Sequence, residues 1–301
     1  MSSNRKIDLA LEAKELAEGS ARQTTRLSGV RAEEDTVFGL PLTRVDILDQ
    51  RGEQALGKPR GTYLTMELPE LPQEREEILR AARGVAAMLE TLDCLPQTGL
   101  VLVVGLGNRQ VTPDAVGPKT ADALLVTRHL IQNLPDQFAG LRPVAALAPG
   151  VTGATGMESG ELLAALVKRL NPVCLIAVDA LAARRQERVC RTIQVADTGI
   201  VPGSGVGNAR MALDQKTLGV PVIAVGVPTV VDAATLCLDL LEESGEKSFD
   251  PAIFRQEGAE WFVTPRTIDS QVHTLSRILG LGISTALHVD FSVEDVEKWT
   301  S

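Results

Sequence analysis

The chain has 301 residues and a formal net charge of −9, and 44% of its residues are hydrophobic while 23% are charged. This length suits one large α/β domain or two small ones, and the composition is typical of a globular protein. A uniformly acidic surface repels phosphate backbones, so no nucleic-acid partner is expected. No segment approaches the roughly 18 consecutive apolar residues of a membrane span, so no membrane association is expected.

The N-terminal part of the chain predicts a helix, several short strands and a long amphipathic helix. Residues 8–35 are charged and permissive for helix, and short β-like segments follow at 36–48 and 61–68. Residues 73–92 place apolar side chains at helical spacing. The six residues that define this apolar face are Ile78, Leu79, Ala82, Val85, Ala86 and Leu89.

From residue 100 onward, apolar strands alternate with amphipathic helices. Because the strands lack an apolar–polar alternation, the pattern predicts an α/β three-layer sandwich with a mostly parallel central sheet. Ligands of such sheets bind at the carboxyl ends of the strands. The predicted elements are strands at 100–105, 143–149, 173–181, 187–197 and 220–233, helices at 113–134, 160–170 and 269–287, and a surface excursion at 242–258.

Two of these strands lead to an aspartate. The run LVLVVGLGNRQVTPD brings Asp114 to the carboxyl end of one strand, and VCLIAVD ends another at Asp179. If the strands are near neighbours, both carboxylates face one cleft, where one pKa rises and the pair divides general acid and base roles on a bound water. Alternatively, each aspartate is a helix cap or a turn former.

Glycine-rich loops at 149–161 and 202–208 form a second candidate feature. Their exposed N–H groups can hold an anion or an extended peptide backbone, although both loops can also be simple tight turns. The segment GLGNRQ begins like the G-x-G-x-x-G nucleotide fingerprint, but Gln110 stands where the third glycine belongs. A nucleotide-binding α/β domain is therefore the competing function.

Other chemistries have less support in the sequence. It contains no H-E-x-x-H or C-x-x-C zinc pattern and no G-x-S-x-G nucleophile elbow. The four cysteines show no close pairing, which indicates a reducing, cytoplasmic location and no disulfide framework.

Long segments resemble the germination protease family of spore-forming Firmicutes. They are VLVVGLGNRQVTPDAVGPKTADALLVTRHL, LAPGVTGATGMES, NPVCLIAVDALAAR, IQVADTGIVPGSGVGNAR and GVPVIAVGVPTVVDA, within a resemblance that covers about residues 7–290. The family implies a fold similar to that of hydrogenase-maturation endopeptidases. It also implies an endopeptidase without a cofactor that initiates the degradation of small acid-soluble spore proteins during germination, in the forespore and spore core.

The resemblance also assigns roles to residues. The two catalytic aspartates of the family match Asp114 and Asp179. The family is synthesised as a zymogen that removes its own N-terminal segment, and KIDLALEA matches the cleavage pattern, which places the cut between Asp8 and Leu9. Residues 1–8 are then a propeptide, shorter than in the Bacillus enzymes, and residues 9–301 are a single protease domain. A homotetramer is implied as well.

The remaining site predictions concern supporting residues and a metal-dependent alternative. We expect Asn108 to orient the loop or the attacking water. The related hydrogenase proteases use an acid pair with a histidine to recognise nickel, and a nickel-dependent processing protease is therefore an alternative. His288 is the histidine to examine for it, although we expect no required metal. The glycines expected to line the substrate groove are Gly150, Gly153, Gly203 and Gly205.

Overall fold

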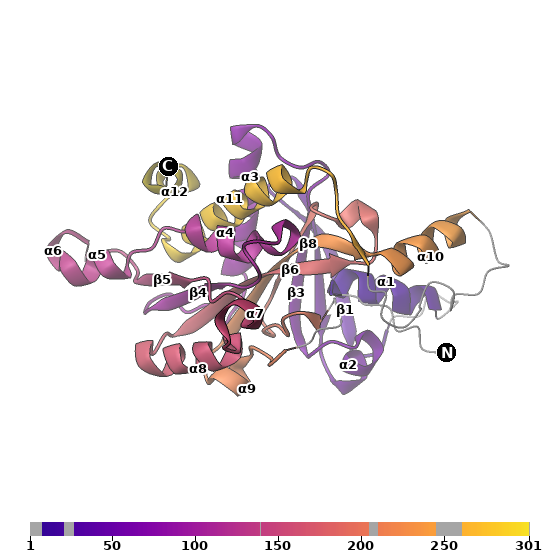
Figure 1. Ribbon diagram of the computed structural model, residues 1–301, viewed down its shortest axis with the longest axis horizontal. Helices are drawn as coiled ribbons and strands as arrows, with labels where there is room; N and C mark the ends of the chain where they lie inside the picture. Colours follow the sequence, from indigo (N-terminus) through magenta and orange to yellow (C-terminus); the bar gives the residue numbers. More distant parts are fainter. Residues whose placement is uncertain (1–7, 21–26, 139, 205–209, 245–260, 301) are drawn as a thin grey trace.

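The computed structural model describes residues 8–20, 27–138, 140–204, 210–244 and 261–300. In these residues a nine-stranded sheet forms the middle layer, with helices on both faces (Figure 1), which confirms the predicted α/β sandwich. The strand order is β1-β2-β3-β7-β8-β6-β4-β5, and β9 pairs with β8. The strands are β1 (Val30–Val37), β2 (Leu40–Ile47), β3 (Gly61–Glu67), β4 (Val101–Gly105), β5 (Val144–Leu147), β6 (Cys174–Ala183), β7 (Thr192–Ala196), β8 (Val222–Asp232) and β9 (Phe262–Val263).

Parallel pairing is confined to β5, β4, β6 and β8, so the sheet is mixed and contains fewer parallel pairs than the sequence suggests. β7 pairs antiparallel with both β8 and β3, and β1, β2 and β3 continue the sheet as antiparallel neighbours. Phe38 and Gly39 join β1 to β2 with φ of 49° and 75°. Two successive positive φ values are typical of a two-residue hairpin turn, and only antiparallel strands can be joined by so short a turn.

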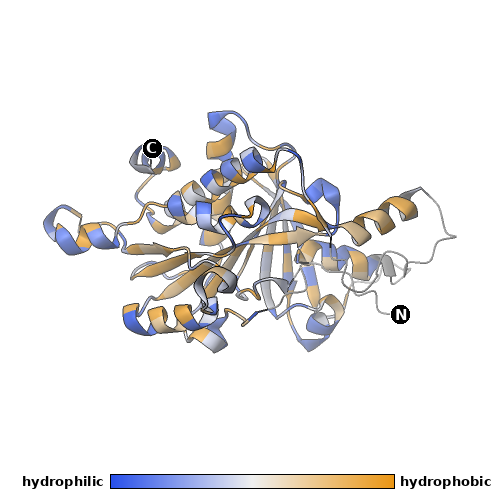
Figure 2. Cartoon of the chain, in the orientation of Figure 1, coloured by the Kyte–Doolittle hydropathy of each residue, from blue (hydrophilic) through white to orange (hydrophobic). Residues whose placement is uncertain are grey.

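One face of the sheet carries the larger core. It is covered by α3 (Arg75–Glu90), α4 (Val116–Asp122) and α11 (Ile268–Leu287), with α12 (Val293–Thr300) packed beside them. All six apolar residues predicted for the face of α3 are buried, which confirms the amphipathic reading of 73–92. Figure 2 shows the apolar strands inside and the hydrophilic helix surfaces outside.

The opposite face is divided between two helix groups. α8 (Ser159–Leu170) and α9 (Gln215–Leu218) pack on β4, β6 and β8 through Leu163, Val167 and Leu218. α1 (Ala10–Ser20) and α2 (Gln50–Leu56) pack on β2 and β3, where Val45 and Tyr63 are buried. This leaves the carboxyl ends of the parallel strands between the two groups.

The single helix predicted at 113–134 is divided in the structure. It consists of the 3-10 turn η1 (Thr112–Asp114), α4 and α5 (Arg128–Asn133), followed by α6 (Pro135–Phe138). Tertiary hydrogen bonds of Thr127 interrupt the helix. The N–H of Thr127 donates to the carbonyl of Val144 in β5, and Thr127 Oγ1 accepts from the N–H of Val144.

Other differences from the predicted elements are local. The strand predicted at 187–197 begins as the 3-10 turn η2 (Gln186–Arg188) and becomes β7 only at Thr192. α10 (Ala233–Glu243) and α12 are not predicted, and most of the 242–258 excursion lies outside the described residues. Within the described part of the chain, no helix has the length and apolar content that crossing a membrane requires.

Candidate active site

Asp114 is placed at the end of β4 by a tight glycine loop. Its Oδ2 accepts a hydrogen bond of 2.7 Å from the backbone N–H of Asn108. Gly107 has a φ of +110°, and a Cβ there would lie 2.1 Å from the carbonyl oxygen of Asp114. Only glycine permits this approach. The loop that resembles a nucleotide fingerprint therefore wraps around a carboxylate.

Asp179 belongs to the strand next to β4. β4 and β6 pair in parallel, with Gly105 opposite Val178. The strands that lead to the two aspartates are therefore neighbours, as the hypothesis of a shared cleft requires. Asp179 is not at the tip of its strand, because pairing with β8 extends β6 to Ala183. Its side chain is 5% exposed, and its Oδ1 accepts a 2.9 Å hydrogen bond from the N–H of Ala180.

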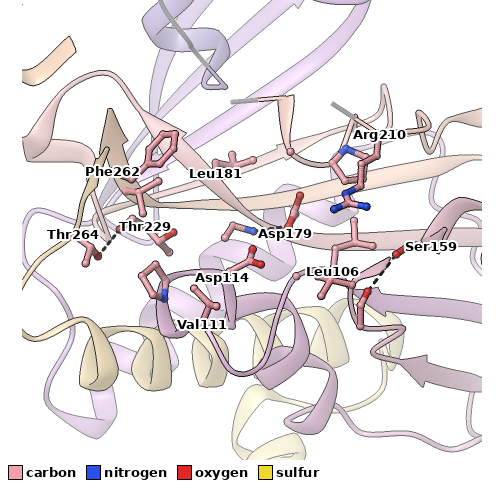
Figure 3. A pocket seen from close by; sticks show the side chains of 18 residues that line it. Leu106, Val111, Asp114, Ser159, Asp179, Leu181, Arg210, Thr229, Phe262 and Thr264 are labelled. Atoms are coloured by element: carbon pink, nitrogen blue, oxygen red, sulfur yellow. Dashed lines mark hydrogen bonds between the residues drawn. The ribbon is translucent and has the colours of Figure 1, made fainter. Parts of the chain in front are cut away.

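The two carboxylates line one cavity of about 470 Å³, toward which both point (Figure 3). The cavity lies at the carboxyl ends of the parallel strands, where ligands of such sheets bind. Its volume is that of a typical small-ligand or peptide site. The walls are largely apolar and are formed by Leu106, Val111, Pro113, Leu181, Val230 and Phe262, among others.

The environment separates the proton affinities of the pair. Burial raises the pKa of Asp114, while the N–H of Asn108 and the positive charge of Arg210 oppose the rise. Burial raises the pKa of Asp179 well above the usual range, and the negative charges of Asp114 and Asp8 add to this effect. Asp179 is therefore the member that keeps a proton when Asp114 is ionised, an arrangement suited to general acid–base chemistry.

Arg210 is a residue of the cavity that the sequence reasoning missed. Its guanidinium extends toward the two carboxylates in Figure 3. Nη1 donates to Thr152 Oγ1 at 2.6 Å and lies 3.3 Å from Glu158 Oε2, which fixes the head group. The available signal was a single charged residue two positions after the glycine loop 202–208.

The supporting residues of the sequence prediction have different positions. Gly150 and Gly203 line the cavity with φ values of +77° and +74°, whereas Gly153 lies in α7 (Thr152–Thr155) outside the lining. Gly205 falls outside the described residues. Asn108 contacts Asp114 through its backbone, and its Oδ1 accepts from the N–H of Gln110 at 3.0 Å, so this residue shapes the loop.

The segment around the predicted cut is bound to the enzyme. Gln194 of β7 holds the backbone on both sides of the Asp8–Leu9 bond: its Oε1 accepts from the N–H of Ala10 at 2.8 Å, and its Nε2 donates to the carbonyl of Asp8 at 3.5 Å. Leu9 is fully buried.

Gln194 and Asp179 lie in one line across the sheet. Gln194 pairs with Gly226 of β8, and Gly226 pairs with Asp179 of β6. Residues that are opposite one another on neighbouring strands point to the same face. Gln194, which binds the Asp8–Leu9 segment, and Asp179 therefore lie on the same face of the sheet, with Gly226 between them.

The structure places His288 away from this cavity. His288 is 4% exposed and lines a separate cavity with Gly99, Arg142 and Phe291. Gly99 precedes β4 and Arg142 precedes β5, so His288 lies at the amino ends of these strands, the edge opposite to the aspartates. His288, the histidine to examine for the nickel-dependent alternative, therefore does not lie in the cleft, because α11 begins beside η1 and ends at the opposite edge of the sheet. Among the described residues there is no group of three His, Cys, Asp or Glu side chains that could hold a metal ion.

Comparisons with known proteins show the family to which the chain belongs. A family model described as germination protease matches residues 10–244. A germination protease from Clostridium perfringens is 41% identical over 98% of this chain and 99% of its own length, and one from Bacillus cytotoxicus is 44% identical over 98% and 96%. Among solved structures, the [NiFe] hydrogenase maturation protease HycI from Thermococcus kodakarensis is similar at 14% identity, with a TM-score of 0.34 over 66% of this chain and 98% of its own. The chain therefore belongs to the germination protease family, and it is a peptidase.

Proposed function

We propose that this peptidase is an endopeptidase in which Asp114 and Asp179 activate a water molecule. The observation that carries the proposal is the pair of carboxylates, from neighbouring parallel strands, in one largely apolar cavity. Ionised Asp114 takes a proton from the water molecule. At the same time the oxygen of this water attacks the carbonyl carbon of the peptide bond. Asp179 gives its proton to the leaving nitrogen, and the proton on Asp114 then resets the pair.

The self-processing step is proposed to cut between Asp8 and Leu9. Support comes from Gln194, which holds the backbone on both sides of this bond on the same face as Asp179. The cut releases residues 1–8 as a propeptide and leaves 9–301 as the protease domain. The proximity of Asp8 to the pair is also seen in its charge, which raises the pKa of Asp179.

The proposed substrates are the small acid-soluble spore proteins, cut at the start of germination. This assignment is supported by the name that the curated relatives share, germination protease. The homotetramer and the location in the forespore and spore core stay predictions from the family resemblance.

The test is self-cleavage of the purified full chain at mildly acidic pH. Mass spectrometry of the wild-type protein is expected to show loss of the eight residues up to Asp8, whereas Asp114→Asn and Asp179→Asn retain them. Asp290→Asn, an exposed aspartate far from the cavity, is the matched control and is expected to process normally. If either active-site variant cuts itself at the wild-type rate, the assignment of the pair is wrong.

A further inference from the structure

A cavity of about 390 Å³ lies at the edge of the sheet opposite to the aspartate pair. It is lined by the residues just before β4 and β5 and by the end of α11 with the residues that follow it. Within the described residues, the charged and titratable side chains of this lining are those of Arg142, His288 and Asp290. The proposed hydrolysis uses none of these groups.

Arg142 is a partly buried arginine that forms no ion pair in the described part of the chain. Its Nε donates to the carbonyl of Gly99 at 3.1 Å, whereas its Nη2 is buried and has no acceptor among the residues that the structure describes. Burial lowers the pKa of Arg142, although the nearby thiol of Cys174 opposes this effect. A guanidinium that leaves water is normally compensated by an anion. The cavity beside Arg142 is therefore a place where an anion would be stabilised.

His288 lines the same cavity. It is 4% exposed, and neither of its ring nitrogens makes a hydrogen bond of normal geometry with a described residue. Burial lowers the pKa of His288, the backbone of Leu125 opposes this, and the positive charge of Arg142 lowers the pKa further. This effect of Arg142 shows that the two side chains lie close together. A buried imidazole N–H without an acceptor is costly, so an oxygen ligand that accepts from His288 would be favoured.

We propose that this cavity binds a phosphate group, as inorganic phosphate or a small phosphate monoester, with Arg142 and His288 as its donors. A tetrahedral phosphate presents oxygens in several directions, so it can accept from a guanidinium and an imidazole at once. Because Arg142 Nη2 and both ring nitrogens are buried, the ligand reaches them through a small rotation of the two side chains. The net charge of the protein is −9, so a general attraction of anions does not account for binding here.

The backbone on both sides of the proposed site is held by hydrogen bonds. Thr127 Oγ1 donates to the carbonyl of Arg142, and the N–H of His288 donates to the carbonyl of Ser284 at 3.0 Å. Asp290 is the one acid among the described lining residues, and it is exposed and forms no ion pair with Arg142. Its negative charge opposes the binding of an anion without neutralising the guanidinium.

The experiment follows the imidazole signals by NMR while inorganic phosphate is added to the full chain at constant pH and ionic strength. Of the three histidines, His129 and His273 are exposed and lie outside the cavity, so their signals are internal references. The His288 signal, assigned by its loss in His288→Gln, is expected to shift and to saturate, whereas the other two stay nearly constant. Glycerol 3-phosphate and acetate are titrated in the same way, and acetate is expected to bind at least about 10-fold more weakly.

Variants test the donors. Arg142→Met is expected to raise the phosphate concentration at half-saturation by at least about 10-fold, because a charge-assisted hydrogen bond is lost. Asp290→Asn is expected to lower this concentration by about 2- to 5-fold, because a like charge is removed. Arg169→Met, on the exposed surface of α8, is the matched control and is expected to bind as the wild type does. Circular dichroism shows whether Arg142→Met is folded, and Asp290→Asn, a surface change, tests the site in either case.

Thermal unfolding provides an independent measurement. A ligand that binds only the native state raises the midpoint of unfolding, but phosphate also stabilises many proteins by its exclusion from their surface. The informative quantity is therefore the phosphate-dependent rise in the wild type minus that in Arg142→Met, and it is expected to be positive. Arg169→Met is expected to show the full rise of the wild type.

The outcomes are separate from those of self-cleavage, which none of these measurements uses. The site is overturned if the His288 signal responds to neither phosphate compound, or if Arg142→Met and Asp290→Asn both bind phosphate as the wild type does. Acetate binding as tightly as phosphate overturns the assignment to a phosphate group. If the site is supported, the tighter of inorganic phosphate and glycerol 3-phosphate shows whether the free ion or a monoester is preferred.

Discussion

At the scale of single residues, the two aspartates differ in their surroundings. Asp179 lies inside the sheet, whereas Asp114 lies on a 3-10 turn at the cavity wall, where Arg210 opposes the rise in its pKa. The same elements that bury Asp179 are those that bring it beside Asp114. Burial and charge repulsion therefore act together on one carboxyl group.

The rate of self-cleavage should show a bell-shaped dependence on pH. Activity needs Asp114 ionised and Asp179 protonated, so protonation of Asp114 limits the acid side and ionisation of Asp179 limits the alkaline side. Because burial raises the pKa of both groups, both limbs should lie above the value of about 3.9 for a free aspartate. The measurement is the initial rate across pH. A rate that stays constant from neutral to alkaline pH would contradict the model.

Asp179→Asn should stabilise the protein while abolishing its activity. Between the pKa of an unfolded aspartate, about 3.9, and the higher pKa of folded Asp179, the native state binds more protons, so wild-type stability falls as pH rises. The asparagine removes this dependence and keeps an acceptor for the N–H of Ala180. Thermal unfolding should show the variant more stable by a few degrees at neutral pH, with the difference shrinking below the unfolded pKa. Equal midpoints at all pH values would refute the buried, protonated carboxyl.

At the scale of secondary-structure elements, the position of Asp114 depends on how closely α4 approaches the sheet. Gly117 in the first turn of α4 packs against Leu106, which directly follows β4, and against Val178 in the middle of β6. A Cβ there would lie 2.2 Å from the carbonyl oxygen of Leu106 and 2.5 Å from that of Val178. Both contacts are with backbone, which cannot yield as a side chain can. The absence of a side chain at Gly117 thus allows the helix to hold the aspartate next to β6.

Gly117→Ala should therefore displace α4 and impair both stability and activity. The expected loss in the free energy of unfolding is about 3 kcal/mol, as for other overpacked sites. Urea denaturation gives the loss, and the rate of self-cleavage reports the shift of Asp114. Gly140→Ala is the matched control, because a Cβ at Gly140 has no neighbour within 4 Å, and its effect should stay within about 0.5 kcal/mol. Equal stabilities for the two variants would show that α4 can move without cost.

At the scale of the whole molecule, α1 connects the N-terminus to a distant part of the sequence. Glu12 is 1% exposed and accepts from the N–H groups of Arg184 and Arg185, and Arg188 lies 3.5 Å from its carboxylate. Arg188 also pairs with Glu15 at 2.6 Å. These contacts hold α1 and the Asp8–Leu9 bond against β6 and β7.

Glu12→Ala should release α1 from the sheet. The variant leaves the buried N–H of Arg184 and the partly buried N–H of Arg185 without an acceptor, which is expected to cost about 2–4 kcal/mol in the free energy of unfolding. Glu18→Ala on the same helix removes only an exposed pair with Lys14 at 3.6 Å and should cost less than about 1 kcal/mol. Urea denaturation measures both, and digestion by an added protease should cut the Glu12→Ala chain faster near α1. Equal digestion rates would show that α1 is held by its apolar contacts alone.

Much of the fold could be predicted from local patterns. The apolar face of α3, the strands β4, β6 and β8 and the helix α11 follow from the spacing and length of apolar runs, because such patterns depend on neighbours within a few residues. The division of 113–134 could not be predicted, since Thr127 is held by Val144 of another strand. The antiparallel pairing of β1, β2, β3 and β7 could not be predicted from the sequence either, because most strand pairs join residues that are far apart in the chain.

By itself, the sequence determined which residues form the apolar strands and that two of those strands lead to Asp114 and Asp179. Only the tertiary structure decided that β4 and β6 are neighbours, that Arg210 reaches the pair and that His288 lies at the opposite edge. It also decided that Lys58 and Asp8 share a cavity. The physical reason is that helical and strand periodicity depends on residues close in sequence. The tertiary contacts of a side chain depend instead on segments that meet only when the whole sheet has assembled.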